Sequence, residues 1–377
     1  MAQPDPSGGL PGYAEHFEEP AGYLDFARYG PPSRDVLAAT AEALGRSARA
    51  GRDTVDELMR ADERARAAAA RLAGTDAAHT VLLPNASTGL FHAAFGIPSG
   101  TVLVPAADFP ANHYPWRRSA ALGRAVPRWL RADARGLITP DAVRAALTDD
   151  VVALAVSAVD FRTGARADLA GLREVIGEDR LLVVDGIQGF GAADLPWPAA
   201  DVLVTGGQKW LRASWSTGFA ALSDRALERL EPTLTGWTGV TDVAVFDDTE
   251  HPVAPGAGRW SITNLSPVAA AAFAAALELV EAATVPAIEA HIALRVDQLI
   301  DTVRARGGEI LSPTDPDRRA GIVSFHLPGT DPADVAKALH AHDVTPSVRA
   351  PTVRLSAHAS TPHSAVERVD AALKSLR

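Results

Sequence analysis

The sequence predicts an α/β fold, in which a parallel sheet is covered by helices on both faces and a smaller domain follows. Its 377 residues, 47% hydrophobic and 22% charged, are enough for two packed domains. Short, nearly continuous apolar runs alternate with helical stretches, as in sheets whose strands are buried on both faces. A long Ala-rich helical stretch then leads into a second group of strands and helices.

Apolar periodicity places the elements of the first domain. Helical spacing between Ala39 and Leu72 predicts one or two helices. The expected buried strands are Thr80–Leu83, Thr101–Val104, Val151–Val156, Leu181–Val184 and Val202–Val204. Right-handed crossovers bring the carboxyl ends of such strands to one edge of the sheet, where ligands bind in these folds.

The second domain is expected to begin with a helix. Helical spacing predicts one long helix from Pro267 toward Arg306, which Gly307 and Gly308 end. Strands are expected after it at Glu309–Leu311, Ile322–Phe325 and Val353–Leu355, with a last amphipathic helix at Ser364–Leu376.

Composition excludes several classes of function. A net charge of −10 argues against a nucleic-acid binder, because phosphate backbones require clustered Lys and Arg. No stretch approaches the about 20 apolar residues of a membrane helix. Residues 1–9 lack the basic and apolar segments of a signal peptide, so we expect a cytoplasmic protein. The absence of cysteine removes disulfides, thiolate metal sites and any cysteine nucleophile, and we expect no metal in the site.

The segment Asn85-Ala86-Ser87-Thr88-Gly89 lies between an expected strand and an expected helix. The hydroxyls of Ser87 and Thr88, with the free N–H groups of a helix N-terminus, form an anion site suited to a phosphate. Taken alone, the segment is better explained as a plain N-cap.

Asp185 directly follows an expected buried strand, in the segment Val184-Asp185-Gly186-Ile187-Gln188. A carboxylate in this place can pair with the nitrogen of a bound pyridine ring and keep it protonated, which makes the ring an electron sink. Gln188 could donate to a ring hydroxyl. The alternative is that Asp185 caps the next helix.

Lys209 follows the next expected strand, in the segment Thr205-Gly206-Gly207-Gln208-Lys209-Trp210. A lysine between small residues and an apolar strand loses solvation, which lowers the pKa of its amine and favours imine formation. The alternative is an ordinary solvated lysine, but the chain has few lysines and this loop carries little charge.

Arg354 lies inside the apolar run 353–355. Its planar guanidinium is suited to bind an α-carboxylate bidentately, and an internal salt bridge is the alternative. Trp237, in the turn Gly236-Trp237-Thr238-Gly239, offers an indole donor.

Together and in this order, these segments resemble the class V aminotransferase family of pyridoxal-5′-phosphate (PLP) enzymes, from about Leu24 to Leu376. The resemblance implies the PLP-dependent transferase fold of type I, an α/β fold with a mostly parallel seven-stranded sheet. It implies a large PLP-binding domain at residues 34–250 and a small α+β domain made of residues 1–33 and 251–377. It further implies that Lys209 holds PLP as a Schiff base, and that the protein is a homodimer with the active site at the interface.

Further motifs extend the resemblance to single residues. Asp108-Phe109-Pro110-Ala111-Asn112 with Pro115-Trp116 resembles the family's Glu-His-His-Ala-Asn…Pro-Trp segment, so Phe109 takes the place of the His that stacks on PLP. Arg354-Leu355-Ser356 matches the motif whose arginine binds the substrate carboxylate, and Val159–Gly164 and the Gly236 turn resemble kynureninases. The resemblance assigns PLP binding to Ser87, Thr88, Phe109, Asp185, Gln188, Gln208, Lys209, Trp237 and Thr263. It assigns substrate binding to Phe26, Trp116, Phe161, Arg162 and Arg354.

The chain departs from the family pattern in two of these places. Gly206-Gly207-Gln208-Lys209 replaces Ser-Gly-His-Lys, which changes two usual phosphate contacts. The segment Arg259–Asn264, which contains Thr263, departs from the family's Gly-Thr-Pro pattern. In the resemblance, Trp237 and Thr263 reach a PLP phosphate across the dimer interface.

The absence of a catalytic cysteine and its loop restricts the reactions that this site can catalyse. Cysteine desulfurases of the family carry a catalytic Cys on a loop before the carboxylate arginine, whereas the run from Arg349 to Arg354 has neither, so desulfurase chemistry is excluded. Chemistry that needs only Lys209 as acid and base remains. Gly186–Gly191 and Gly207–Ala213 are most similar to the C–S lyases of ergothioneine biosynthesis. That similarity implies β-elimination of a cysteine S-conjugate sulfoxide, hercynylcysteine sulfoxide, to a sulfenic acid, pyruvate and ammonia.

Such a small amino-acid substrate carries a trimethylammonium group, which aromatic faces attract by about 1–2 kcal/mol when desolvated. The chain has 7 tryptophans, and Phe26, Trp116, Trp210 and Trp215 are the candidates near the motifs. Three alternatives stay open. One is an aminotransferase or epimerase of secondary metabolism, another is a kynureninase-like hydrolase, and the third is a non-catalytic relative without a functional lysine.

Overall fold

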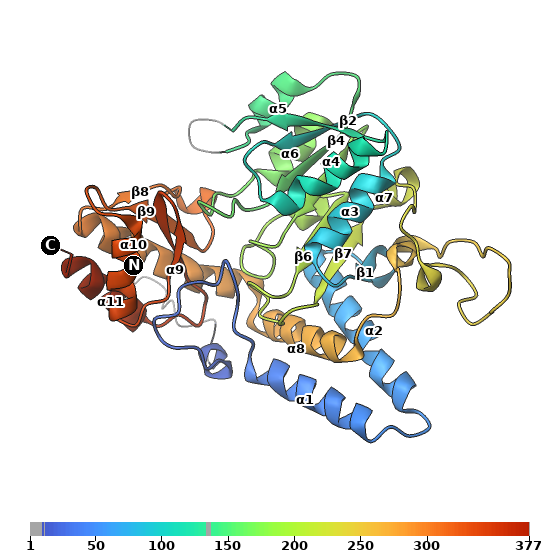
Figure 1. Cartoon of the computed structure of the whole chain (residues 1–377), viewed down its shortest axis with the longest axis horizontal. Coiled ribbons are helices and arrows are strands. Elements are labelled where there is room, and N and C mark those ends of the chain that lie inside the picture. Colours follow the sequence, from blue (N-terminus) through green and yellow to red (C-terminus); the bar gives the residue numbers. More distant parts are fainter. Residues whose placement is uncertain (1–9, 11, 133–136, 377) are drawn as a thin grey trace, which may run out of the picture.

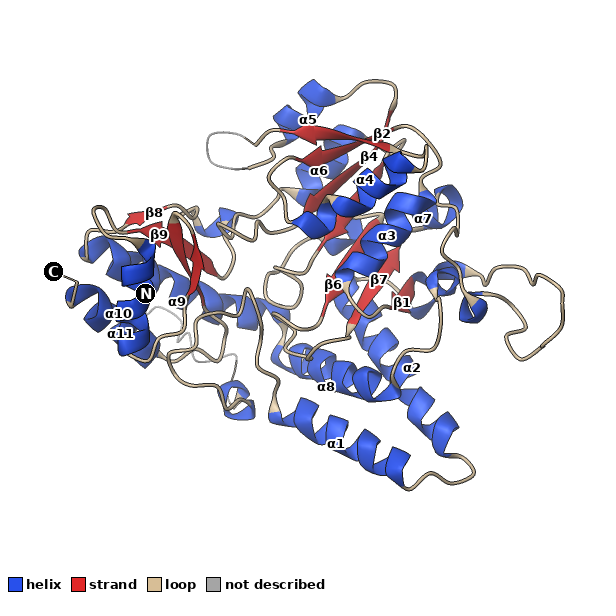
Figure 2. Ribbon diagram, viewed as in Figure 1, coloured by secondary structure: helices blue, strands red, loops and turns tan. Residues whose placement is uncertain are grey.

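The computed structural model of the chain describes residues 10, 12–132 and 137–376. Residues 1–9, on which the expectation about a signal peptide depends, lie outside this part. The described residues form two sheets flanked by helices, a large one and a smaller one, which lie side by side in Figures 1 and 2. This is the α/β, two-domain arrangement that the sequence predicts.

The large sheet has 7 strands in the order β1-β7-β6-β5-β4-β2-β3. Only β7 runs antiparallel to its neighbours β1 and β6, and the remaining neighbours are parallel. The bounds are β1 Thr80–Leu82, β2 Thr101–Pro105, β3 Val126–Leu130, β4 Val151–Ser157, β5 Leu181–Asp185, β6 Val202–Gly206 and β7 Gly218–Leu222. The mostly parallel seven-stranded sheet of fold type I is therefore confirmed.

Helices cover this sheet on both faces, and the strand sequences show why. Along β5, Leu182 and Val184 belong to one core cluster, whereas Leu181 and Val183 belong to another. Because successive residues of a strand point to opposite faces, each face needs its own apolar cover. The covering helices are α2 Thr54–Ala73, α3 Ala86–Gly96, α4 Tyr114–Ala121, α5 Pro140–Ala146, α6 Leu169–Ile176, α7 Asp224–Arg229 and α8 Pro267–Ala283, and α1 Arg34–Ala48 packs on α2 and α8.

The single long helix expected from Pro267 toward Arg306 is wrong. Helix α8 ends at Ala283, Thr284 takes a left-handed φ of 63°, and α9 begins at Val285. Pro286 explains the break, because proline lacks the N–H of a continuing helix and restricts the residue before it. Helix α8 packs against α1 and α2 (Figure 1), and the chain continues from Thr284 through α9 to the smaller sheet.

Within the described residues, no single helix has the length and apolarity to cross a membrane. Helices α8 and α9 satisfy that criterion only as a pair, and the pair is bent by 80° at Thr284. Much of the apolar surface of α8 is packed in the core, including Phe273, Leu277 and Val280.

The small sheet has 4 antiparallel strands in the order β10-β11-β9-β8. Its elements are α9 Val285–Ala305, β8 Glu309–Ile310, β9 Ile322–His326, α10 Pro332–Ala341, β10 Ser347–Arg349, β11 Thr352–Ser356 and α11 His363–Lys374. The N-terminal segment joins this sheet through β-bridges of Tyr23 to Thr345 and of Asp25 to Ser356. The assignment of the segment before Arg34 to the small domain stays a prediction.

Candidate active site

The parallel strands bring the candidate residues to one edge of the large sheet. Ser157, Asp185 and Gly206 end β4, β5 and β6, and these strands are parallel neighbours. Strand β1 also runs parallel to β6, since both are antiparallel to β7. Asn85, three residues beyond the end of β1, therefore lies at the same edge as Lys209, as expected for a ligand site in such a fold.

Lys209 is half-buried in the loop that follows β6. Its amine makes no hydrogen bond or ion pair with any described residue and lies 5.5 Å from the centre of the Phe109 ring. Burial lowers the pKa of Lys209 from 10.5 to about 8. An amine with this pKa is partly neutral near pH 8, which suits it to act as a nucleophile and as a base.

The backbone on both sides holds Lys209 in place. Gly30 donates its N–H to the Gln208 carbonyl over 2.9 Å. A Cβ added at Gly30 would lie 1.9 Å from the Lys209 carbonyl oxygen, so only glycine permits this approach. The N-terminal segment is thus fitted directly against the lysine loop.

Asp185 is buried, and only 2% of its surface is exposed. One carboxylate oxygen accepts the Ile187 N–H over 3.0 Å, and the other makes no hydrogen bond with a described residue. Burial raises the pKa of Asp185 from 3.8 to about 6, and the nearby charge of Asp108 contributes to this rise. The Asp185 carboxylate therefore lacks the cation that a buried carboxylate normally has.

Phe109 is held at the same edge by its neighbour Asp108. The Asp108 carboxylate accepts the Ser157 hydroxyl over 2.6 Å and the Asn112 amide over 2.9 Å, so it ties the segment to the end of β4. The Phe109 ring meets the Phe161 ring edge to face, with centres 5.2 Å apart. Phe109 is 41% exposed beside the Lys209 amine, as a ring that stacks on a cofactor should be.

The N-terminus of α3 follows β1, and Asn85 is its N-cap. The Asn85 side chain accepts the Thr88 N–H over 2.9 Å and the Thr88 hydroxyl over 3.2 Å. The N-cap interpretation is therefore correct, but it does not remove the anion site, because the first N–H groups of the helix and the Ser87 hydroxyl stay available. Gly89 brings α3 against β6, since an added Cβ would lie 2.5 Å from Val204.

The two candidate glutamines differ in their surroundings. Gln188 is buried, donates to the Ala27 carbonyl over 2.9 Å and accepts the Trp210 indole N–H over 2.8 Å. Only its second amide hydrogen is left for a ring hydroxyl, so its main contacts join the N-terminal segment to the lysine loop. Gln208 is half-buried and lies against Gly206, where an added Cβ would come within 2.5 Å of the Gln208 amide oxygen.

Arg354 of β11 is 2% exposed and has internal partners. It donates to the Phe161 carbonyl over 2.7 Å and to Ser347 over 3.1 Å, and it forms an ion pair with Asp25 over 3.4 Å. The internal salt bridge is therefore present. The Arg354 Nε is buried without a partner, however, so one N–H of the guanidinium is left for a further acceptor. Burial lowers the pKa of Arg354.

Arg162 is also paired. Its guanidinium forms a bidentate contact with Asp160, with a shortest distance of 2.6 Å, and lies 5.7 Å from the centre of the Phe161 ring. Asp160 additionally accepts the backbone N–H groups of Arg162 and Thr163, which fixes the turn. A substrate role of Arg162 stays a prediction.

Trp237 and Thr263 lie next to each other. The Trp237 indole N–H donates to the Thr263 hydroxyl over 3.2 Å, and Trp237 is 51% exposed. A Cβ added at Gly236 would lie 2.0 Å from the Ile262 carbonyl oxygen, so this glycine allows the two segments to meet. Their expected contact with PLP in a second subunit stays a prediction.

The structure contradicts the expected substrate contacts of Phe26 and Trp116. Both side chains have 0% exposed surface. Phe26 packs against Tyr23 and His358, and Trp116 donates its indole N–H to Asn112 over 3.0 Å inside the core. Trp210, another candidate for the aromatic site, is 1% exposed. Proximity in sequence to a motif does not determine which way a side chain points.

Sequence reasoning did not single out Asp25, Ser347 or Asp108 as site residues. Two of these residues contact Arg354, Asp25 from 329 residues away in the sequence and Ser347 from 7 residues away. No sequence pattern reports a contact across a separation as long as that of Asp25. Asp108 was visible as the first residue of the segment that contains Phe109. Its position directly before the stacking aromatic was a usable signal.

The arrangement fits PLP on the chemistry of its groups. A free amine, a buried carboxylate without a cation, an exposed aromatic face and a helix N-terminus match the aldehyde, ring nitrogen, ring face and phosphate of this cofactor. Among the described residues, no group of three or more His, Asp or Glu side chains is placed to hold a metal ion.

Comparison with known proteins agrees with this reading. The model of the aminotransferase class-V family matches residues 23–358. A probable cysteine desulfurase of Methanothermobacter thermautotrophicus is 26% identical over 331 residues, which cover 84% of this chain and 80% of the relative. A kynureninase of Deinococcus radiodurans is 30% identical over 136 residues, which cover 35% of this chain and 33% of the relative.

Solved structures share the whole fold. The cystine C–S lyase C-DES, in complex with its product cysteine persulfide, superposes with a TM-score of 0.85 at 19% identity, covering 97% of this chain and 98% of that one. A variant of C-DES carries glycine covalently linked to PLP.

The fold and the site thus define a PLP-dependent enzyme of fold type I. The chain belongs to the class V aminotransferase family.

Proposed function

We propose that this PLP-dependent carbon–sulfur lyase eliminates the sulfur substituent from a cysteine S-conjugate sulfoxide. The substrate we propose is hercynylcysteine sulfoxide, and the products are a sulfenic acid, pyruvate and ammonia. Reduction of the sulfenic acid then gives ergothioneine. Relatives named as cysteine desulfurases and the cystine lyase of the same fold support cleavage of a C–S bond.

One observation supports elimination without sulfur transfer to the protein. The unpartnered amine of Lys209 is positioned at the sheet edge in a chain that contains no cysteine. A sulfoxide leaves with its own oxygen and needs no protein thiol to receive the sulfur. The β10–β11 connection is consistent with this, because only Ala350 and Pro351 separate the two strands and leave no long loop.

Lys209 moves the protons in the proposed elimination, and bound PLP would stabilise the negative charge. PLP, when bound, supplies an electron sink for the charge that develops at the substrate Cα. Lys209 takes the proton from Cα, for which a pKa of about 8 is suited. The Cβ–S bond then breaks with its electron pair on sulfur, and the protonated amine of Lys209 returns the proton to the departing sulfenate. The remaining three-carbon fragment takes up one water, whose oxygen replaces the nitrogen that leaves as ammonia, and becomes pyruvate.

Of the four aromatic candidates, Trp215 is the exposed one, which supports it as the site for a trimethylammonium group. This residue is 62% exposed and stacks on Tyr29, with ring centres 5.8 Å apart. Tyr29 precedes Gly30, which packs on Lys209, so the pair lies beside the lysine loop. Exposed aromatic faces near the amine support recognition of a quaternary ammonium, whose attraction to a ring is about 0.5–1 kcal/mol at an exposed site.

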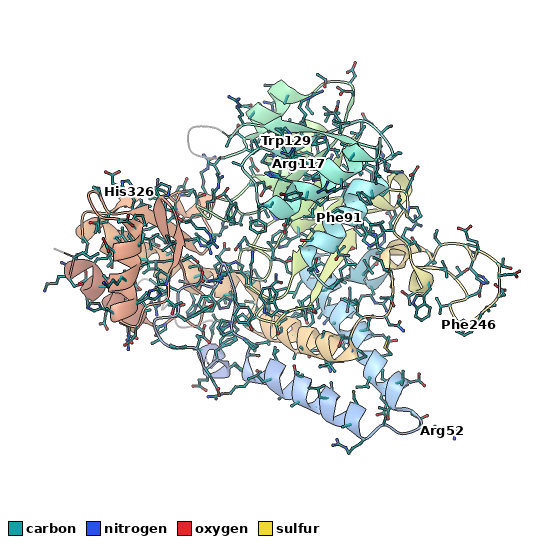
Figure 3. All side chains as sticks on the ribbon, viewed as in Figure 1. Arg52, Phe91, Arg117, Trp129, Phe246 and His326 are labelled. Carbon is teal, nitrogen blue, oxygen red and sulfur yellow. The ribbon has the colours of Figure 1, made fainter. Side chains whose placement is uncertain are left out.

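A homodimer is part of the proposal. Trp237 and the loop that follows it expose apolar side chains, with Val245 51% and Phe246 89% exposed. Figure 3 shows Phe246 on a loop that projects from the body of the molecule. Such surface is normally covered by a partner. A second copy is the partner that would let Trp237 and Thr263 approach a phosphate.

The test is to incubate the purified protein and PLP with S-substituted cysteine sulfoxides, including hercynylcysteine sulfoxide, and to measure pyruvate. We expect pyruvate and ammonia in equal amounts, without any added keto acid. Release of a keto acid that depends on an added amino-group acceptor would instead show an aminotransferase. A change of configuration at Cα without release of pyruvate would show an epimerase.

A kynureninase-like hydrolase is the second candidate, and the relative from Deinococcus radiodurans favours it. The turn at Gly236 supports it as well. Release of anthranilate from kynurenine, together with no pyruvate from any sulfoxide, would decide for the hydrolase.

A further inference from the structure

Arg349 lies on the same face of the small sheet as Arg354. In the β10–β11 pair, Ser347 is opposite Arg354 and Arg349 is opposite Thr352. Because side chains alternate between faces along a strand, these four residues share one face, and Val348 and Val353 point to the other. Arg349 and Arg354 are diagonal neighbours across the pair, a distance that long side chains span.

The two arginines differ in what they contact. The guanidinium of Arg354 is buried and tied to Asp25, Ser347 and the Phe161 carbonyl. Arg349 is exposed and has no ion pair with a described residue, and the one hydrogen bond that its side chain makes with a described residue is a long one of 3.3 Å to the Val348 carbonyl. Arg349 is therefore a cation without a counterion on the face that carries Arg354.

The charge of Arg349 acts on both Lys209 and Arg354. After burial, it is among the causes that lower the pKa of Lys209 and the pKa of Arg354. The charges around Arg354 include the cations Arg349 and Arg28, whereas Asp25 is the acidic group that acts on it. The cations that act on Arg354 therefore outnumber the acidic groups that act on it, although the whole chain has a net charge of −10.

We propose that Arg349 is a second anion-binding residue of the substrate site, which binds a carboxylate on the distal part of the substrate while Arg354 binds the carboxylate at Cα. This inference rests on the proposed function. It names the substrate class as amino acids that carry a second carboxylate beyond sulfur. Hercynylcysteine sulfoxide belongs to this class, because its betaine half ends in a carboxylate. One arginine cannot grip two separated carboxylates bidentately, and the second guanidinium supplies the missing partner.

The β10–β11 hairpin explains why Arg349 could bind the same substrate as Arg354. The short connection through Ala350 and Pro351 keeps Arg349 next to the strand that carries Arg354, instead of on a long loop. A substrate aligned by Arg354 at one end would have its sulfur substituent above Lys209. The distal carboxylate could then extend to Arg349 at the tip of the hairpin.

The test compares two probes that differ in one charge, S-(carboxymethyl)cysteine sulfoxide and its neutral amide, S-(carbamoylmethyl)cysteine sulfoxide. Each is given to wild-type holoenzyme, Arg349→Ala, Arg349→Lys and the control Arg52→Ala. Arg52 is an exposed arginine between α1 and α2, at the opposite end of the molecule from the small sheet (Figure 3). Pyruvate formation gives kcat and KM, and calorimetry with the corresponding thioethers gives Kd separately from turnover.

We expect Arg349→Ala to raise KM and Kd for the carboxymethyl probe by about tenfold or more, as for loss of a charged hydrogen bond. The carbamoylmethyl values and both kcat values should change less than about twofold, Arg349→Lys should recover part of the affinity, and Arg52→Ala should match wild type. Equal loss on both probes, or no loss on either, would overturn the role of Arg349. If wild-type enzyme releases no pyruvate from either sulfoxide, the proposed function fails, and the calorimetric comparison alone decides whether Arg349 binds the distal carboxylate.

Discussion

The site has two walls, one at the edge of the large sheet and one on the small sheet, and their ionisable residues differ in how far they are paired. On the large sheet, Lys209 and Asp185 have almost no polar partners, and burial shifts the pKa of each toward its neutral form. On the small sheet, Arg354 is buried but contacts Asp25, Ser347 and the Phe161 carbonyl. The two groups that would meet the cofactor are left unpaired, whereas the arginine that would bind the substrate is held in place.

This difference shows how one site can combine reactivity with rigid binding. An unpaired buried ion is costly, so the fold keeps Lys209 and Asp185 ready for a ligand that supplies the missing partners. A prepaired arginine does not have to be ordered when the substrate arrives, which reduces the entropic cost of binding. Each wall can be tested by changes that affect only one of the two functions.

The largest effect is expected for Lys209→Ala. Without the amine, the Cα proton has no base, and the rate of pyruvate release should fall by about 10³-fold or more. The visible absorbance of bound PLP should change or disappear as well. Lys337→Ala, a change of an exposed lysine on α10, is the matched control and should keep both activity and spectrum. A Lys209→Ala enzyme with near-normal activity would remove the base assignment.

Arg354→Ala should be the most damaging change of the small-sheet wall. It leaves the Asp25 carboxylate buried without its cation, for which we expect a loss of about 3–5 kcal/mol in the free energy of unfolding. Chemical denaturation measures it. Arg349→Ala removes an exposed arginine from the same hairpin and should change stability by less than about 0.5 kcal/mol.

Adding Asp25→Asn to Arg354→Ala separates charge from packing. If the lost stability comes from an unpaired carboxylate, the double variant should recover a large part of it. A double variant as unstable as the single one would show that Arg354 acts by filling space.

The sequence predicted the large-sheet wall far better than the small-sheet wall. Strands β5 and β6 are continuous apolar runs, so their ends, and with them Asp185 and Lys209, could be located from local pattern alone. Strand β3 contains Pro127 and Arg128 and is only partly buried, and β7 is rich in Ala and Gly. Neither gives the apolar signal of a central strand.

The small-sheet wall depends on contacts between distant segments. The ion pair of Asp25 with Arg354 joins opposite ends of the chain, and periodicity carries no information about it. The same limit explains Phe26 and Trp116, which lie near motifs in sequence but turn into the core. Arg349 was visible only as part of a run, until the strand register placed it on the face of Arg354.

The smallest of these effects is a pH dependence that belongs to Asp185. Burial raises its pKa to about 6 from 3.8, so between these values the folded apoprotein keeps a proton that the unfolded chain has lost. The free energy of unfolding should therefore fall as the pH rises through this window, by at most about 3 kcal/mol from this group. Asp185→Asn cannot ionise and should remove that part of the slope.

Urea unfolding of PLP-free protein at several pH values between 4 and 7 measures both curves, and their difference isolates Asp185 from the other carboxylates. Saturation with PLP should make the wild-type curve flatter, because a ring nitrogen beside the carboxylate stabilises its charged form. Parallel wild-type and Asp185→Asn curves without PLP would mean that the carboxylate is already solvated or paired. Asp185 would then not differ from Arg354 in being buried without a partner.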